Sequence, residues 1–238
     1  MKITVINGTE KHGVTYHLKE IFLESFRQQG ADITEFYLPK DCPAFCIGCF
    51  NCLFKTEEDC KDARAVSAID KSLLEADLIV MASPTYVFHV TGAMKSMLDH
   101  FAYRWMLHRP AKEMFGKRAV IITQCIGSGS RSAARDLKDS LSWWGISKIC
   151  VFSKKLKSRI FWDKIPEKRR AELTKKIKKI SSEYAAIDYS KPARPGISAK
   201  AKFYICRMIQ KKMIKSGRTS IDSSYWSEKG WLGAVRPW

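Results

Sequence analysis

Apolar residues in this chain gather into short runs, and longer segments with helical spacing separate those runs. The runs predict five strands, at residues 2–6, 32–38, 77–83, 118–124 and 148–152. Apolar residues three and four positions apart predict the intervening helices, at residues 14–29, 63–75, 92–105 and 133–144. Strands that are almost continuously apolar are typical of a parallel sheet covered by helices on both faces. The pattern therefore predicts an α/β fold with a five-stranded parallel sheet.

The pattern changes after the fifth strand. Residues 167–187 predict a helix with one apolar stripe, formed by Leu173, Ile177, Ile180 and Tyr184, and with lysines on its other faces. Proline and glycine then interrupt the chain at residues 192–196, and residues 199–215 predict a second amphipathic helix. We expect one domain over residues 1–190 and a basic, tryptophan-containing helical extension over residues 191–238.

Charge separates the same two parts of the chain. Residues 1–150 hold 19 basic and 17 acidic residues, a net charge of +2, whereas residues 151–238 hold 23 and 7, a net charge of +16. A solvated helical surface is the commonest explanation for such a segment. Alternatively, the extension contacts a second subunit or an anionic surface, such as a lipid membrane. Motifs of nucleic-acid-binding proteins are not visible, so we expect no nucleic-acid partner.

The length of the apolar runs bears on where in the cell the protein is expected. None of them approaches the roughly 18 residues that span a bilayer, and the first run, at residues 3–6, is shorter than the core of a signal peptide. We therefore expect a cytoplasmic protein. In that compartment thiols stay reduced, and a dense group of cysteines indicates metal or redox chemistry more often than disulfides.

Ligands of open α/β sheets bind at the carboxyl ends of the strands. The loops at those ends span residues 7–13, 39–62, 83–91 and 124–132. The first contains Gly8, four residues, Gly13 and then Thr15, with Val14 where a P-loop has its lysine. Without that lysine, triphosphate chemistry is improbable. Backbone N–H groups, hydroxyls and the positive end of a helix could still hold a single phosphate. The alternative is an ordinary turn between strand and helix.

The third loop carries a more specific pattern. Residues 83–99, SPTYVFHVTGAMKSMLD, place Ser-Pro-Thr-Tyr after a strand and G-x-M-K-x-M-L-D at the start of a helix. Over residues 1 to about 153, the chain resembles the NAD(P)H-dependent FMN reductases of the flavodoxin-like fold. The resemblance implies a three-layer sandwich with strand order 2-1-3-4-5. It also implies FMN as the cofactor and NAD(P)H as co-substrate.

Particular residues follow from the resemblance. It implies that Thr9, Lys11, Gly13 and Thr15 hold the FMN phosphate and that Pro84, Thr85, Tyr86 and Val87 line the flavin ring. Ile126, Gly127, Ser128 and Gly129 would close its other side. His89 is a candidate acid, although a histidine in such a loop is more often structural. The chemistry itself belongs mainly to the flavin.

Four cysteines lie close together in the second of these loops. Cys46, Cys49, Cys52 and Cys60 have the spacing C-x2-C-x2-C-x7-C, which resembles the iron–sulfur flavoproteins. The resemblance implies a [4Fe–4S] cluster on these four thiolates. The alternatives are bare thiols beside the flavin, a zinc site or a disulfide. Cys42, Cys125, Cys150 and Cys206 show no such spacing and are expected to be packing residues.

These observations lead to one functional hypothesis and one alternative. We expect a homodimeric, FMN-dependent oxidoreductase that passes electrons from NAD(P)H, or from a protein donor, to a quinone, a flavin or another small acceptor. The alternative is an electron-carrier flavoprotein, with or without a [4Fe–4S] cluster, that has no NAD(P)H turnover of its own. A membrane- or nucleic-acid-associated adaptor that has kept the fold is the third hypothesis.

Overall fold

A computed structural model describes residues 1–42, 44–156 and 161–238 of the chain. Its centre is a sheet of five parallel strands, ordered β2-β1-β3-β4-β5. The strands are β1 (Lys2–Asn7), β2 (Asp32–Tyr37), β3 (Leu78–Pro84), β4 (Arg118–Cys125) and β5 (Lys148–Lys155). The predicted strands and their order are thereby confirmed. β3 is buried along its whole length, as its apolar sequence requires.

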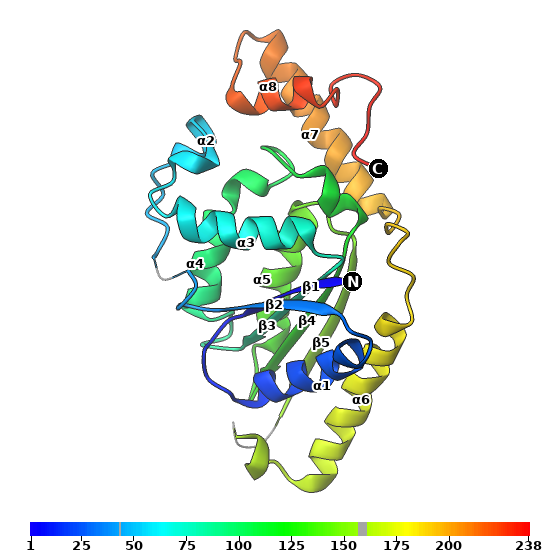
Figure 1. Cartoon of the computed structure of the whole chain (residues 1–238). Coiled ribbons are helices and arrows are strands. Elements are labelled where there is room, and N and C mark those ends of the chain that lie inside the picture. Colours follow the sequence, from blue (N-terminus) through cyan, green and yellow to red (C-terminus); the bar gives the residue numbers. More distant parts are fainter. Residues whose placement is uncertain (43, 157–160) are drawn as a thin grey trace.

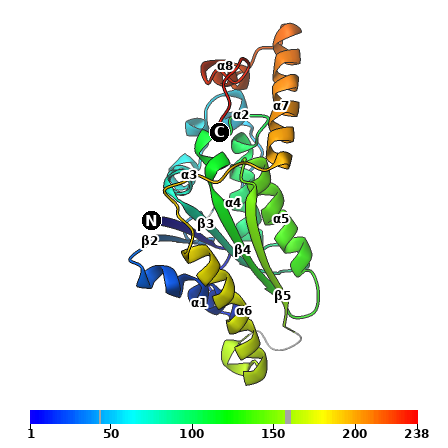
Figure 2. The same ribbon diagram turned by 90° about the vertical axis from the view of Figure 1, so that its right-hand side faces the viewer.

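Helices cover both faces of this sheet (Figures 1 and 2). On one face lie α1 (Val14–Gln28) and α6 (Glu167–Ala185), which pack side by side. On the other face lie α3 (Ala63–Glu75), α4 (Gly92–His100) and α5 (Ser130–Trp143). An apolar core lies on each face of the sheet, and successive strand residues point into opposite cores. Val5 and Val80 point towards α1, whereas Ile6 and Ile79 point towards α3 and α4.

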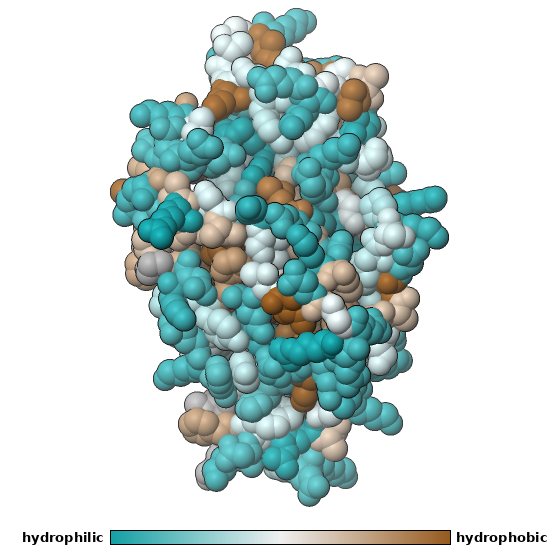
Figure 3. Space-filling view, viewed as in Figure 1, coloured by the Kyte–Doolittle hydropathy of each residue, from teal (hydrophilic) through white to brown (hydrophobic). Residues whose placement is uncertain are grey.

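The extension forms a third apolar cluster at one end of the molecule. The extension consists of α7 (Ile197–Lys215) and α8 (Ile221–Glu228), followed by the C-terminal tail. Phe203, Cys206, Trp226 and Trp231 are buried there against Met106 and Phe115. The tryptophans of the extension therefore pack on the body of the same chain. The face of the molecule seen in Figure 3 is mostly hydrophilic, with small, separate hydrophobic patches.

Several predicted helix boundaries differ from the observed ones. The helix expected at 92–105 ends at His100, and a separate 3-10 turn, η2 (Ala102–Arg104), follows it. This turn carries Arg104 to the carboxylate of Asp70 on α3, to which its Nε donates at 2.9 Å. Burial of a charged guanidinium requires such a partner, and this requirement outweighs helical periodicity. α5 begins at Ser130 rather than at residue 133.

Short helical segments fill the remaining loops: α2 (Asn51–Phe54), η1 (Glu57–Asp59), η3 (Lys112–Gly116) and η4 (Trp162–Lys164). Over the residues described, none of the helices combines the length and apolarity that crossing a bilayer would require. The α2 and η1 segments lie in the loop between β2 and α3, which holds the four spaced cysteines. That loop and the ends of the parallel strands position the candidate sites.

Candidate functional site

The first and third loops are joined by direct hydrogen bonds at the carboxyl edge of the sheet. Gly8 N donates to Ala82 O at 2.8 Å, and the hydroxyl of Thr91 donates to Gly8 O at 2.6 Å. Thr91 also caps α4, because its hydroxyl accepts from Met94 N at 3.1 Å. A Cβ on Gly8 would lie 2.7 Å from Ser83 Oγ, so only glycine fits between these loops.

A pocket of about 200 Å³ opens where these loops meet. Six of the twelve residues predicted to bind the cofactor line it: Thr9, Lys11, Gly13, Thr15, Pro84 and Tyr86. The lining also includes His12, Val14, Gln124 and Phe161, which were not predicted to bind the cofactor. Gln124, the second-to-last residue of the buried strand β4, has a polar side chain in a mostly apolar run, and this is a signal that the sequence offered. Phe161 carries no comparable signal.

Two polar atoms of this pocket are buried without a partner. Within the described part of the chain, nothing bonds to Thr15 Oγ1 or to Gln124 Oε1. Leaving such a group unpaired costs about 1–3 kcal/mol, so a ligand that bonds to both would be favoured. Thr15 lies in the first turn of α1, whose cap, Gly13, has no side chain to bond the free N–H groups. A helix N-terminus of this kind attracts a phosphate.

The remaining predicted residues lie on two loops that pack against each other. Thr85 N donates to Gln124 O at 2.9 Å, and a Cβ on Gly129 would approach Phe88 Cα to 2.6 Å. Val87 and Ile126 are exposed, and neither they nor Thr85 and residues 127–129 line the pocket. These residues therefore form neighbouring loops rather than walls of the cavity.

His89 lies on a different surface. Its Nδ1 is 3.1 Å from Asp136 Oδ2, and its side chain is 65% exposed. It lines a larger cavity of about 680 Å³ between α4 and α5, together with Lys95, Asp99 and Trp105. That cavity is larger than the pocket at the strand ends, but the unpaired buried atoms of Thr15 and Gln124 are in the smaller one. The smaller pocket is therefore the candidate cofactor site.

The second site is the cysteine loop, residues 44–62. Cys46, Cys49, Cys52 and Cys60 all line one cavity of about 20 Å³, together with Asp62 and His100. The tertiary structure thus gathers the four cysteines that the spacing singled out, and each of them is a free thiol. The other four cysteines lie elsewhere, and Cys42, Cys125 and Cys206 are buried as expected of packing residues.

His100 and Asp62 extend this set of donor atoms. One ligand atom each of Cys60, Asp62 and His100 lies within 4.8 Å of the others. His100 is buried, and its Nε2 lies 3.1 Å from Ala44 O. If Nε2 carries the proton and donates to that carbonyl, Nδ1 presents its lone pair to Cys60 Sγ, 3.8 Å away. Asp62 and His100, which lie outside the C-x2-C-x2-C motif, therefore place possible ligand atoms beside Cys60. Their positions in the sequence did not indicate this.

Two thiols of this loop, those of Cys52 and Cys60, are harder to ionise than a free cysteine. Burial raises the pKa of Cys52, and the nearby Cys60, Cys46 and Cys49 raise it further, while Arg109 lowers it. Burial also raises the pKa of Cys60; a hydrogen bond from the Asp62 backbone lowers it, and the charges of Asp62, Cys49 and Cys46 raise it. Four converging thiolates are the donor set that an iron–sulfur cluster or zinc requires. The residues present therefore fit a metal centre.

Comparison with known proteins defines the class to which this site belongs. The sequence model of the family described as NADPH-dependent FMN reductase matches residues 1–154, more than half of the chain. The chain therefore belongs to this family, which confirms the expected resemblance and FMN as the cofactor.

Individual relatives cover only part of the chain. An iron-sulfur flavoprotein of Archaeoglobus fulgidus is 31% identical over 99 residues, which are 42% of this chain and 48% of that protein. The NADPH azoreductase of a Bacillus species is 27% identical over 143 residues, or 60% of this chain and 69% of the azoreductase. The chain thus spans about half the length of the first of these relatives.

Solved structures confirm the fold. An FMN-dependent NADH-azoreductase from Bacillus anthracis, in complex with FMN, has a TM-score of 0.61 and 15% sequence identity. The similarity covers 78% of this chain and all of the azoreductase. At this level of identity, the comparison confirms the flavodoxin-like arrangement of strands and helices and no more.

Proposed function

We propose that this protein oxidises NAD(P)H through FMN bound at the carboxyl edge of the sheet and passes the electrons to a small acceptor such as a quinone or a flavin. One observation supports the location: Thr15 Oγ1 and Gln124 Oε1 are buried and have no partner among the described residues, in the pocket that also contains Lys11, Pro84 and Tyr86. Family membership supports the class of reaction.

In this proposal, each group of residues has its own task. Thr9, Lys11, Gly13 and Thr15 hold the phosphate through hydroxyls, one cation and the N-terminus of α1. Pro84, Tyr86 and Gln124 contact the ring, while Thr85, Val87 and residues 126–129 close over its edge. When bound, FMN supplies hydride acceptance and onward electron transfer. The protein orients the ring and excludes water from it, and His89 takes no part because it lies outside the pocket and pairs with Asp136.

Replacement of Thr15 tests the phosphate site. Thr15→Ala removes a hydroxyl that would bond to a charged phosphate, so FMN affinity should fall roughly ten- to hundred-fold. Thr15→Ser keeps the hydroxyl and is the matched control, with affinity close to that of the parent. Fluorescence titration of the apoprotein with FMN measures both variants. Equal affinity of Thr15→Ala and the parent would contradict this placement of the phosphate.

We also propose that Cys46, Cys49, Cys52 and Cys60 hold a [4Fe–4S] cluster. The convergence of the four cysteines on one cavity supports it, as does the similarity to an iron-sulfur flavoprotein. Such a cluster would supply one-electron transfer beside a flavin that accepts electrons in pairs. In the alternative, electron-carrier function, the protein has no NAD(P)H turnover of its own. Anaerobic NADH or NADPH would then leave the flavin absorbance unbleached.

Metal analysis of anaerobically purified protein tests the cluster. The parent should contain iron and acid-labile sulfide, and Cys49→Ser should lose both while keeping FMN, because three thiolates hold the cluster poorly. Cys150→Ser, on strand β5 away from the loop, is the control and should keep the metal. Zinc without sulfide would favour a mononuclear site. Absence of both metals after reconstitution would leave a loop of bare thiols.

A further inference from the structure

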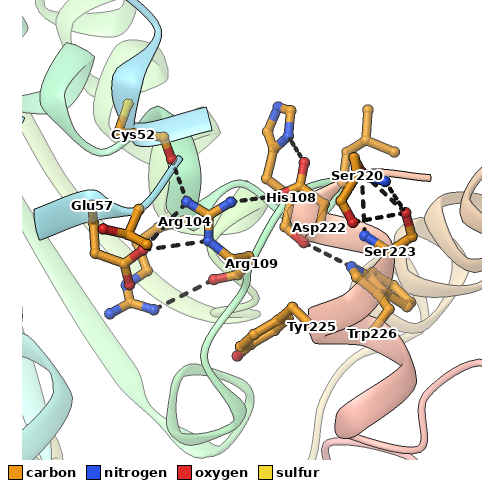
Figure 4. Close-up of polar contacts among 12 residues, drawn as sticks. Cys52, Glu57, Arg104, His108, Arg109, Ser220, Asp222, Ser223, Tyr225 and Trp226 are labelled. Atoms are coloured by element: carbon orange, nitrogen blue, oxygen red, sulfur yellow. Dashed lines mark hydrogen bonds and ion pairs between the residues drawn. The ribbon is translucent and has the colours of Figure 1, made fainter. Parts of the chain in front are cut away.

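The C-terminal arm, residues 191–238, contacts the cysteine loop although the two segments are far apart in the sequence. Helix α8 of the arm packs against α2, which carries Cys52. Figure 4 shows Arg109 between the loop and the arm, with polar contacts to both segments. The contacts between the arm and the loop involve no residue that lines the proposed flavin pocket and no strand of the sheet.

Arg109 bonds to both segments at once. Its Nη1 donates to Asp222 Oδ1 of α8 at 2.5 Å, and its Nη2 donates to the carbonyl oxygen of Cys52. The same Nη2 lies 3.3 Å from Glu57 Oε2, also in the cysteine loop. The side chain is only 5% exposed. A planar guanidinium has several donors in fixed directions, so one arginine can hold two segments in a defined relation.

Asp222 is an unusual residue for its surroundings. Residues 191–238 contain eleven lysines and arginines but only two acidic residues, Asp222 and Glu228. Asp222 is nevertheless buried, and its second oxygen lies 2.7 Å from His108 Nδ1. Burial of a carboxylate is unfavourable unless it is paired and hydrogen-bonded. Both oxygens of Asp222 have such partners, and both partners come from the segment that faces the cysteine loop.

Other contacts fix the arm behind this ion pair. Trp226 Nε1 donates to His108 O at 2.7 Å, and the hydroxyl of Tyr225 donates to Pro110 O at 2.8 Å. At the start of α8, Ser220 and Ser223 cap the helix reciprocally and set the position of Asp222 in its first turn. The arm is therefore attached on both sides of Arg109, at residues 108 and 110.

We propose that the arm holds the cysteine loop in its metal-binding form, with Arg109 as the positioning residue and Asp222 as its anchor in the arm. The proposal builds on the metal centre proposed above. Residues around a metal site that orient its ligands typically contribute 10- to 100-fold to metal affinity. Arg109 acts on the backbone of Cys52, the third of the four cysteines, and not on the metal itself.

The test uses the full-length protein, purified without oxygen. We compare Arg109→Met, Arg109→Lys, Asp222→Asn and the double variant Arg109→Met/Asp222→Asn. Arg236→Ala is the control, because Arg236 lies in the same arm and bonds to Gly233 O and Tyr204 without reaching the loop. Each variant is measured for iron and sulfide, for FMN content, and for the rate of thiol alkylation at each loop cysteine in the metal-free protein.

Arg109→Met should bind metal roughly 10- to 100-fold more weakly, with FMN content unchanged. Its loop cysteines should be alkylated about ten-fold faster because the loop opens more often. Asp222→Asn keeps the shape of the side chain and removes only its charge, so it should show the same changes to a smaller degree. The double variant should resemble Arg109→Met alone, because the two residues act together. Arg109→Lys should be intermediate, since one ammonium cannot replace both arms of the fork.

Parent-like alkylation and metal content in Asp222→Asn and Arg109→Lys would overturn the proposal, as would equal effects in Arg236→Ala. If the parent binds no metal, the proposed metal centre fails. The alkylation rates of the metal-free proteins still decide whether the arm holds the loop. Faster alkylation in Arg109→Met and Asp222→Asn alone then supports the positioning role, and parent-like rates refute it.

Discussion

Val87 and Phe88 adopt positive φ angles of 45° and 71°, which residues other than glycine seldom do. The turn around them is closed by two backbone hydrogen bonds between Tyr86 and His89, of 2.9 and 3.1 Å. Such conformations cost of order 1–3 kcal/mol each and persist where the surrounding structure holds them. Gly129, at φ 97°, packs directly against this turn. Strain in the third loop is thus maintained by the fourth loop, beside the proposed flavin site.

Gly129→Ala should disturb both loops. Its Cβ would meet the backbone of Phe88 at 2.6 Å, and alanine is disfavoured at this φ. We expect the free energy of unfolding to fall by about 1–3 kcal/mol and FMN to bind more weakly. Gly127→Ala is the control for stability, because open space surrounds it, and its free energy of unfolding should stay within about 0.5 kcal/mol of that of the parent. Urea denaturation and FMN titration measure both, and identical results for the two variants would show that the loops are not coupled.

At the scale of secondary-structure elements, α1 shows that a charged side chain can be buried when it is paired with carboxylates. Helical spacing groups Leu18, Ile21, Phe22, Ser25 and Phe26 on one side of this helix; Leu18, Phe22 and Phe26 are buried, whereas Ile21 and Ser25 are half-buried. Lys19, however, is also fully buried, with its Nζ 2.6 Å from Glu35 on β2 and bonded to Glu20. Burial alone would lower the pKa of this lysine, but the two hydrogen bonds to carboxylates outweigh it and raise the pKa. An amphipathic pattern cannot show such a lysine, because the carboxylate of Glu35 comes from another element.

At the scale of the whole molecule, the basic part of the chain is not simply a solvated appendage. Its tryptophans pack on the body of the chain, while one side of α7 is left uncovered: Tyr204, Ile205, Met208 and Ile209 are 37–64% exposed. Exposed apolar residues grouped on one element often mark an interface. We propose that a second copy of the chain covers this side of α7 in a homodimer.

Light scattering of the full-length protein tests this assembly. The parent should have the mass of a dimer, and Ile205→Glu/Met208→Glu should give monomers with unchanged FMN content, because charges would be buried in the interface. Lys211→Glu, an exposed polar position on the same helix, is the control and should stay dimeric. A monomeric parent would contradict the dimer. A dimer that survives both glutamates would place the interface elsewhere.

The sequence alone was sufficient for the fold and for six of the residues that line the candidate pocket. Strand and helix periodicity are local properties of the chain, so apolar runs and helical spacing located all five strands of the sheet. The loops at the carboxyl ends could be identified from those strands. Thr9, Lys11, Gly13, Thr15, Pro84 and Tyr86 therefore came from the sequence, through the first-loop pattern and the family resemblance, and all six line the pocket.

The tertiary structure decided what converges on each site. Gln124 and Phe161 join the flavin pocket, and His100 and Asp62 join the four cysteines, from positions that no spacing rule connects. The contact of Arg109 with Asp222 spans 113 residues, and it depends on how the arm folds back onto the body. Local sequence sets the period of an element, whereas the meeting of two side chains depends on how distant elements pack against each other.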